Sequence, residues 1–227
     1  MVDSLVVASI RRSRWKLGDS TVPGVMHRQA LEESASFARE HMATAMLFED
    51  LAEFRSFAFS KKTVPGLNLE FGVHEGAGVN LFASLTSELV FGFDSFEGLR
   101  EDWSGSNAAV RGFFDRKGRL PRVRPNVRLL KGWFQDTLRP FLAERTEKVS
   151  FANLDADTYE STAYVLDELS DRIVEGTILI FDEYFGYAGW KQNEYRAWQE
   201  FVARKSVTYT YLAICEGRVA LRVNGLS

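Results

Sequence analysis

After Pro65-Gly66, short apolar runs alternate with helical stretches, and this alternation restricts the chain to a small set of folds. The pattern is the sequence signature of βαβ units and a parallel sheet. The last two apolar runs are separated only by Cys215 to Arg218, a link short enough to predict an antiparallel hairpin. We therefore expect an α/β fold in which five parallel strands precede a C-terminal hairpin. The expected strands span residues 67–72, 89–93, 127–131, 149–154, 177–181, 209–214 and 219–223.

The first 62 or so residues have a different character, because they contain no strong strand signal and read as helix from Pro23 onward. An apolar stripe within them recurs at helical spacing and needs something to lie against. We expect an N-terminal helical arm over residues 1–62, acting as a lid or a homodimer contact, and one α/β domain over residues 63–227. The stripe consists of Leu47, Leu51, Phe54 and Ala58, with Glu49, Asp50, Glu53 and Arg55 largely off it.

Composition excludes several classes of protein. Apolar residues make up 45% and charged residues 26% of the 227, which predicts a packed core and excludes wholesale disorder. The net charge of −3 gives no sign of a nucleic-acid or membrane partner. Cys215 is the single cysteine, and the basic run Arg11–Arg14 follows an apolar stretch, the reverse of a secretory signal. We expect a cytoplasmic protein.

A glycine-rich turn follows the first expected strand, in the order Glu70, Gly72, His74, Gly76, Gly78. Glycines allow a sharp turn and the close approach of a ligand to the main chain, and the helix that follows presents free N–H groups. Three residues rather than one separate Gly72 from Gly76, so the spacing is not the dinucleotide fingerprint. A plain strand-to-helix turn is the alternative, and His74 is placed to touch a ligand.

Two further motifs suit a nucleoside. Asp94 ends the second strand about 20 residues after the glycine-rich turn, where an acid accepts hydrogen bonds from ribose hydroxyls. Gly132, Trp133 and Phe134 end the third strand and suit an adenine ring. The alternatives are a helix-capping acid for Asp94 and a core aromatic pair for Trp133 and Phe134.

Acidic residues follow the next two strands: Asp155 and Asp157 after the fourth, and Asp182 and Glu183 after the fifth. Strand ends of a parallel sheet lie at one edge, so these carboxylates are expected to converge there. Clustered carboxylates repel unless a cation lies among them, and oxygen ligands suit Mg²⁺. For Asp157 the alternative is a helix-capping pair with Glu160.

Taken in order, these motifs resemble those of the class I S-adenosylmethionine-dependent methyltransferases, and more narrowly the macrocin and mycinamicin sugar O-methyltransferase group. The resemblance covers roughly residues 65–200. It implies a Rossmann-like, seven-stranded methyltransferase sheet ending in a hairpin, in agreement with the expected strands. The motifs are Glu70-x-Gly72-x3-Gly76-x-Gly78, Gly92-Phe93-Asp94-Ser95-Phe96-Glu97-Gly98-Leu99, Lys131-Gly132-Trp133-Phe134, Leu154-Asp155-Ala156-Asp157-x-Tyr159-x-Ser161-Thr162 and Phe181-Asp182-Glu183-Tyr184.

The resemblance also implies roles for single residues. The Gly72–Gly78 loop would hold the methionine part of the cofactor, Asp94 the ribose, and the adenine would lie among residues near Trp133. Asp155, Asp182 and Glu183 would hold Mg²⁺, although the family pair after the fifth strand is usually Asp-Asp or Asp-Asn. The implied cofactor-binding residues are Glu70, Gly72, His74, Gly76, Gly78, Asp94, Ser95, Gly132, Trp133, Phe134 and Asp155.

The expected activity is methyl transfer from S-adenosylmethionine to a hydroxyl of a small molecule, in which Mg²⁺ would bind the acceptor oxygens and lower their pKa. Without a metal, Asp155 or His74 would be the base. We expect Tyr184, Phe185, Tyr187 and Trp190 to form an apolar wall of the acceptor pocket, with the 95–126 connection closing over it. The alternatives are a nicotinamide-dependent oxidoreductase and a cofactor-binding partner protein without activity.

Overall fold

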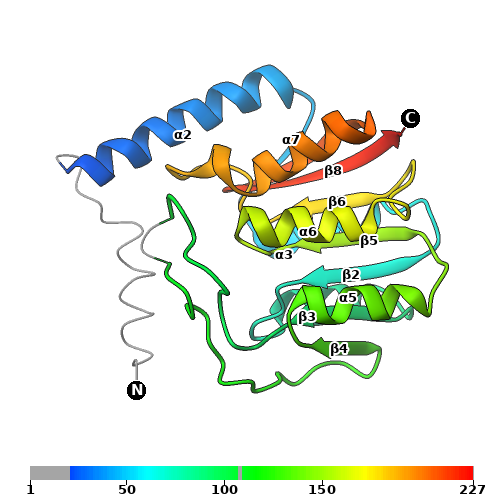
Figure 1. Ribbon diagram of the computed structural model, residues 1–227. Coiled ribbons are helices and arrows are strands. Elements are labelled where there is room, and N and C mark those ends of the chain that lie inside the picture. Colours follow the sequence, from blue (N-terminus) through cyan, green and yellow to red (C-terminus); the bar gives the residue numbers. More distant parts are fainter. Residues whose placement is uncertain (1–20, 107–108, 227) are drawn as a thin grey trace.

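The computed structural model describes residues 21–106 and 109–226, and the N-terminal part of the expected arm lies outside this range. One sheet of eight strands runs through the molecule in the order β1-β7-β8-β6-β5-β2-β3-β4 (Figure 1). The strands are β1 (Met46–Phe48), β2 (Leu67–Phe71), β3 (Val90–Asp94), β4 (Val127–Lys131), β5 (Val149–Leu154), β6 (Ile178–Phe181), β7 (Thr208–Cys215) and β8 (Arg218–Gly225). The helices are α2 (Val22–His41), α3 (Leu51–Ser60), α4 (Ala77–Ser84), α5 (Phe134–Ala143), α6 (Tyr159–Leu169), the short 3₁₀ helix η1 (Trp190–Gln192) and α7 (Glu194–Lys205).

The expected topology is confirmed. β2 to β6 pair in parallel, and β8 pairs antiparallel with both β6 and β7. The carboxyl ends of the parallel strands therefore lie along one edge of the sheet, and the long connection after β3 runs along this edge (Figure 1). Ligands of open α/β sheets bind at such edges.

One strand was not expected. Met46–Phe48 forms β1, which pairs in parallel with β7 at the sheet edge, although the sequence analysis found no strand in the arm. Leu47 belongs to this strand and is 78% exposed, so the helical apolar stripe does not begin there. The helix begins at Leu51, where the Asp50 carboxylate caps it by accepting the Glu53 N–H at 2.8 Å. β1 is held by backbone pairing to a distant strand, which leaves no local sequence pattern.

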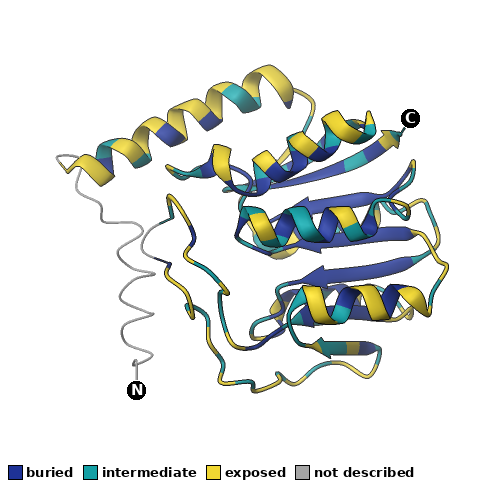
Figure 2. Cartoon of the chain, in the orientation of Figure 1, coloured by how far each residue is buried: buried dark blue, intermediate teal, exposed yellow. Residues whose placement is uncertain are grey.

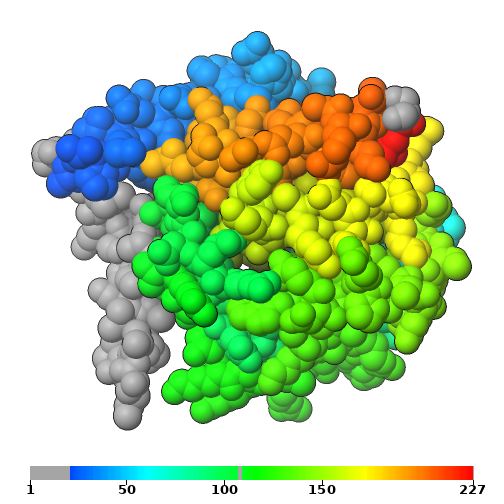
Figure 3. Space-filling model, in the orientation of Figure 1, coloured from blue at the N-terminus to red at the C-terminus, as the bar shows by residue number. Residues whose placement is uncertain are grey.

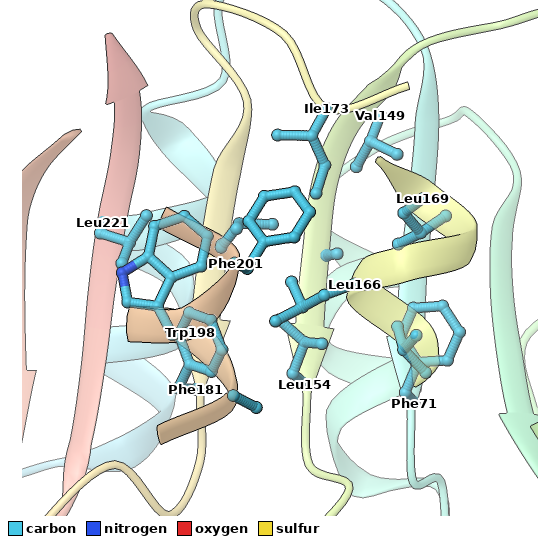
Figure 4. Close-up of a cluster of buried hydrophobic side chains, with 14 of the residues drawn as sticks. Phe71, Val149, Leu154, Leu166, Leu169, Ile173, Phe181, Trp198, Phe201 and Leu221 are labelled. Atoms are coloured by element: carbon cyan, nitrogen blue, oxygen red, sulfur yellow. The ribbon is translucent and has the colours of Figure 1, made fainter. Parts of the chain in front are cut away.

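Helices cover both faces of the sheet, and two apolar clusters form the core. α5, α6 and α7 pack on one face, where Phe181, Trp198 and Leu166 interdigitate between strands and helices (Figure 4). α3 and α4 cover the other face through Phe54 and Phe82. This two-sided burial explains why the central strands read as continuous apolar runs rather than alternating ones (Figure 2).

α2 lies beside α7 with much of its outer surface exposed (Figure 2). Its Ser34 hydroxyl accepts the Gly186 N–H at 2.9 Å, and the Phe37 ring meets the Tyr195 ring edge-on at 5.4 Å. These contacts join the arm to the segment after β6. Among the described helices, none is long and apolar enough to cross a membrane.

Candidate active site

A cavity of about 270 Å³ opens at the carboxyl ends of the parallel strands. The connection after β3 lies over this edge in the space-filling view, drawn in green (Figure 3). The cavity has two halves, which we call the cofactor half, at β2, β3 and β4, and the acceptor half, at β5, β6 and β8. The cofactor half is lined by Gly72, His74, Asp94, Ser95, Gly132, Trp133 and Phe134, and the acceptor half by Arg55, Asp155, Asp182, Glu183 and Arg218.

Asp94 organises the cofactor half. One carboxylate oxygen accepts the N–H groups of Val73 at 2.8 Å and His74 at 2.7 Å, and the other accepts the Phe96 N–H at 2.6 Å. Hydrogen bonds to a carboxylate are about twice as strong as neutral ones. Asp94 therefore fixes the turn after β2, and it also lines the cavity, where a ribose would need an acceptor.

The glycine-rich turn is built around close approaches between backbone segments. Gly72 has φ +90°, and a Cβ there would lie 1.9 Å from the Asp155 carbonyl oxygen. A Cβ at Gly78 would lie 2.0 Å from Glu70 Oε1, so α4 passes directly over that carboxyl group. Glu70, Gly76 and Gly78 are outside the cavity lining, and they shape the turn rather than reach into the cavity.

Glu70 is a buried acid beneath this turn, 1% exposed. Its Oε1 accepts the Asn153 amide N–H at 3.0 Å. Burial raises the pKa of Glu70 to about 8, although the nearby Arg55 charge lowers it. The carboxyl group therefore favours its neutral form at pH 7.

Aromatic and backbone groups complete the cofactor half. Trp133 lies in the cavity with the Arg100 guanidinium 5.8 Å from its ring centre, and Phe134 packs edge-on against Phe71 at 5.5 Å. The Ser95 hydroxyl accepts the Glu97 N–H at 3.1 Å. Gly132 lines the cavity beside Trp133 with φ +145°, and a Cβ there would lie 2.8 Å from Thr137 Cγ2. A flat ring beside exposed backbone groups suits an adenine.

Charged side chains from distant segments form the acceptor half. Asp182 is buried, and its Oδ1 accepts from Arg55 Nη2 at 3.1 Å and from Arg218 Nε at 2.9 Å. Arg55 Nη2 also lies 3.7 Å from Asp155 Oδ2. Burial raises the pKa of Asp155 well above its usual range, the Asp182 and Asp157 charges add to the effect, and the Arg55 charge opposes it.

These acids do not fit a metal site as they are arranged. Two guanidinium groups occupy the Asp182 oxygen that a cation would need. Across residues 21–106 and 109–226, no group of three His, Cys, Asp or Glu side chains is placed to hold a metal ion. We therefore derive no chemical step through Mg²⁺, and its presence stays a prediction.

The sequence analysis missed two residues of this half, Arg55 and Arg218, and also Glu194, which is buried outside the cavity lining. Arg55 was placed off the apolar stripe, yet it is buried, 8% exposed, on the sheet side of α3. Arg218 begins β8, and the buried Glu194 carboxylate accepts the N–H groups of Ala156 at 3.3 Å and Glu183 at 2.9 Å. An arginine beside Phe54 on a helix was the available signal for Arg55. Glu194 gave none, because its partners are backbone groups.

The helix-capping alternative for Asp157 is wrong, since Thr158 is the N-cap of α6 and its hydroxyl accepts the Ser161 N–H. Asp157 itself adopts φ +61° and lines the cavity. His74 lines the cavity as well, with its ring centre 5.6 Å from that of Phe114. His27 and His41 lie on α2, away from the cavity.

The four aromatic residues expected to form an acceptor wall lie elsewhere. Tyr184 is fully buried, and its hydroxyl hydrogen-bonds to that of Tyr211 at 2.5 Å. The other three pack among α2, η1 and the 95–126 connection, and none of the four lines the cavity. These four are Tyr184, Phe185, Tyr187 and Trp190.

Comparisons with known proteins agree with this geometry. The family model described as Macrocin-O-methyltransferase (TylF) matches residues 41–222, a range that includes every residue lining the cavity. A curated relative from Streptomyces olivaceus, 8-demethyl-8-(2,3-dimethoxy-alpha-L-rhamnosyl)-tetracenomycin-C 4'-O-methyltransferase, is 33% identical over 147 residues, which are 53% of this chain and 54% of the relative. The chain thus spans about half the length of this curated relative.

Two solved structures share the fold. CalS11, a calicheamicin methyltransferase, aligns with a TM-score of 0.62 at 22% identity, covering 97% of this chain and 93% of its own. The O-methyltransferase NovP aligns with a TM-score of 0.56 at 23% identity, covering 76% of this chain and 79% of its own. The motifs, the sheet order and the matched range thus lead to one conclusion: the chain belongs to the macrocin O-methyltransferase (TylF) family.

Proposed function

We propose that the protein transfers a methyl group from S-adenosylmethionine to a hydroxyl group of a small molecule that carries a sugar. The observation that carries this proposal is the cavity at the strand ends, in which a half suited to a nucleoside adjoins a half that holds a carboxylate suited to act as a base. The sulfonium of the donor would lie between the two halves, near Gly72 and Asp155.

The chemistry requires little of the protein beyond alignment and removal of one proton. An Asp155 carboxylate oxygen takes the proton of the acceptor hydroxyl. The acceptor oxygen uses a lone pair to form the new bond to the methyl carbon, and the C–S bond breaks with its electron pair passing to sulfur. S-Adenosylhomocysteine, the methyl ether and a neutral Asp155 carboxyl group result.

Asp155 is the better of the two candidate bases. It lies in the acceptor half, and the Arg55 guanidinium, whose Nη2 lies 3.7 Å from Asp155 Oδ2, favours the ionised carboxylate that a base needs. His74 lies in the cofactor half, where its backbone N–H donates to Asp94 and its ring packs near that of Phe114. We retain His74 as the second candidate.

A deoxysugar hydroxyl is the acceptor class we propose. The curated relative is named for 4'-O-methylation of a rhamnosyl group, and CalS11 is also described as a TDP-rhamnose 3'-O-methyltransferase. The names of these proteins support a sugar for this chain without fixing which one. A homodimer, the arm as a lid or dimer contact, and a cytoplasmic location stay predictions. The expected Mg²⁺ is not part of this proposal, because the described acids are not arranged to hold it.

Calorimetric titration with S-adenosylhomocysteine tests the cofactor. We expect wild type to bind it and Asp94→Ala to bind at least tenfold more weakly, whereas Asp115→Ala, on the exposed part of the same connection, binds like wild type. A failure of wild type to bind would refute the proposal, and a fluorescence shift with NADH instead would favour the oxidoreductase alternative. Methyl transfer is then sought by mass spectrometry on a panel of deoxysugar-bearing compounds.

A further inference from the structure

Two arginines converge on one buried carboxylate oxygen at the bottom of the acceptor half. Arg55 comes from α3 and Arg218 from the start of β8, and they approach Asp182 Oδ1 at 3.1 and 2.9 Å. The side chains of Arg55 and Asp182 are 9% and 6% exposed, and that of Arg218 is 18% exposed. Charges removed from water to this extent persist only when they are paired.

The two guanidinium groups exclude a metal cation from Asp182 Oδ1. Mg²⁺ binds carboxylates at about 2.0–2.1 Å and requires near-octahedral geometry. An ion on Asp182 Oδ1 would lie close to both guanidinium groups, and like charges repel strongly where they are shielded from water. The two arginines would have to leave before a metal could bind.

The neighbouring acids do not replace Asp182 as metal ligands. Asp155 Oδ2 lies 3.7 Å from Arg55 Nη2, so it also faces a guanidinium group. Both Glu194 oxygens accept backbone N–H groups, from Ala156 and Glu183. Across the described residues, no three His, Cys, Asp or Glu side chains are placed together so that they could hold a metal ion.

Arg55 still has an N–H group that is unpaired among the described residues, and a charge that could act in the reaction. Within the described part of the chain its Nε has no hydrogen-bond partner, although the atom is buried, and the residue lines the cavity. Its charge faces Asp155 and favours the ionised carboxylate that a base requires. A fixed cation also stabilises negative charge developing on an acceptor oxygen.

We propose that Arg55 and Arg218 occupy, as fixed organic cations, the position that a divalent metal would take between Asp155 and Asp182, so that methyl transfer by this chain needs no metal. Only the statement about metal-free methyl transfer rests on the proposed function. The occupation of Asp182 by the two arginines can be tested without any turnover. Arg55 acts here as a positioning residue for Asp155.

Mn²⁺ binding, followed by the electron paramagnetic resonance of the free ion, provides the first test. We expect full-length wild type, with S-adenosylhomocysteine present, to bind no Mn²⁺ in a saturable way. The Arg55→Met/Arg218→Met double variant frees the Asp182 carboxylate and is expected to gain at least tenfold in Mn²⁺ affinity. Arg222→Met, on the same face of β8, is the matched control and should behave like wild type.

Contrary outcomes are clear. Saturable Mn²⁺ binding by wild type that Asp182→Asn abolishes would overturn the proposal. So would a folded double variant with no gain in affinity. If the double variant does not fold, Arg218→Met alone serves, because it removes one of the two cations and is expected to show a smaller gain.

Turnover in excess EDTA provides the second test. We expect wild type to keep its rate, whereas a loss of turnover that added Mg²⁺ restores would overturn the proposal. Arg55→Lys should retain more activity than Arg55→Met, since it keeps the charge. S-Adenosylhomocysteine binding is measured in parallel: if it fails, the proposed function fails, and the Mn²⁺ result still decides the role of the arginines.

Discussion

The two halves of the cavity are built in different ways. The cofactor half is formed mainly by backbone groups of the turns after β2 and β3. One carboxylate, Asp94, accepts hydrogen bonds from three of their N–H groups. In the acceptor half, long charged side chains from α3 and β8 meet the acids after β5 and β6. The first half is fixed by local geometry, and the second by charge balance between distant segments.

This difference separates the effects expected of substitutions. Changes in the cofactor half should weaken both the fold and the binding of the nucleoside, since the same groups serve both. Changes at the reacting edge of the acceptor half should slow the chemical step and leave cofactor binding nearly unchanged.

The largest effect is expected for Asp155→Asn. The amide keeps the shape but cannot take the acceptor proton, so kcat should fall by about 10²–10⁴-fold, the usual contribution of a general base. S-Adenosylhomocysteine affinity should stay within a few-fold of wild type, as measured by calorimetry. Asp157→Asn, two residues further along the same loop, serves as control and should lose much less activity.

If Asp155→Asn retained its turnover while His74→Gln lost it, the base would lie in the cofactor half. The division of labour between the halves would then be wrong.

The next largest effect is expected for Asp94→Asn. One of the two oxygens becomes an amide nitrogen and the charge is lost, so the unfolding free energy should fall by about 2–4 kcal/mol, as for several charged hydrogen bonds. Urea unfolding measures this change. Asp115→Asn is the matched control, because exposed Asp115 accepts only the Lys117 N–H, at 2.6 Å, and should cost about 1 kcal/mol or less.

An Asp94→Asn protein as stable as wild type, yet unable to bind S-adenosylhomocysteine, would contradict this account. It would show that Asp94 acts on the ligand alone and that the turn forms without it.

Glu70 lies where the two halves meet, under the Gly78 backbone and near Arg55. Burial raises its folded-state pKa from the ordinary value of 4.5 to about 8. A raised folded pKa stabilises the fold at low pH, and this contribution is lost as pH rises from 4.5 through 8. The loss is at most roughly 1.4 kcal/mol per pH unit.

Glu70→Gln should therefore flatten the decline in stability across this pH window. The measurement is the unfolding free energy of wild type and Glu70→Gln at several pH values, with exposed Glu160→Gln as control. Parallel curves for wild type and Glu70→Gln would show that Glu70 does not bind its proton more tightly in the folded state.

The two halves also differ in how far the sequence reveals them. Gly72, Asp94 and Trp133 were found because each follows a strand at a spacing set by local geometry, and the structure brings them to one cavity. The strands themselves were readable because burial on both faces leaves continuous apolar runs. The acids Asp155 and Asp182 were found for the same reason as Asp94: they end strands.

The partners of these acids were not readable. Arg55 and Arg218 are 163 positions apart, by subtraction of their numbers, and only the packing of α3 against the sheet brings them to one oxygen. Likewise Tyr184 read as a pocket residue because it follows a strand, but Tyr195 of α7 and Tyr211 of β7 pack against it, and it is fully buried. Long-range packing decides which of these side chains reach the cavity, and the spacing of residues along the sequence does not reveal that packing.

The smallest effect is expected for Arg100→Met. Exposed Arg100 lies over Trp133, and an exposed cation–π contact is worth about 0.5–1 kcal/mol. S-Adenosylhomocysteine affinity should therefore fall by no more than about fivefold, by calorimetry, while Arg111→Met on the same connection changes nothing. The cofactor half depends on backbone groups and ring faces, so removal of a charge at its rim should be tolerated. A loss of a hundredfold or more would mean that Arg100 binds the ligand directly, and the cofactor half would then depend on side-chain charge as the acceptor half does.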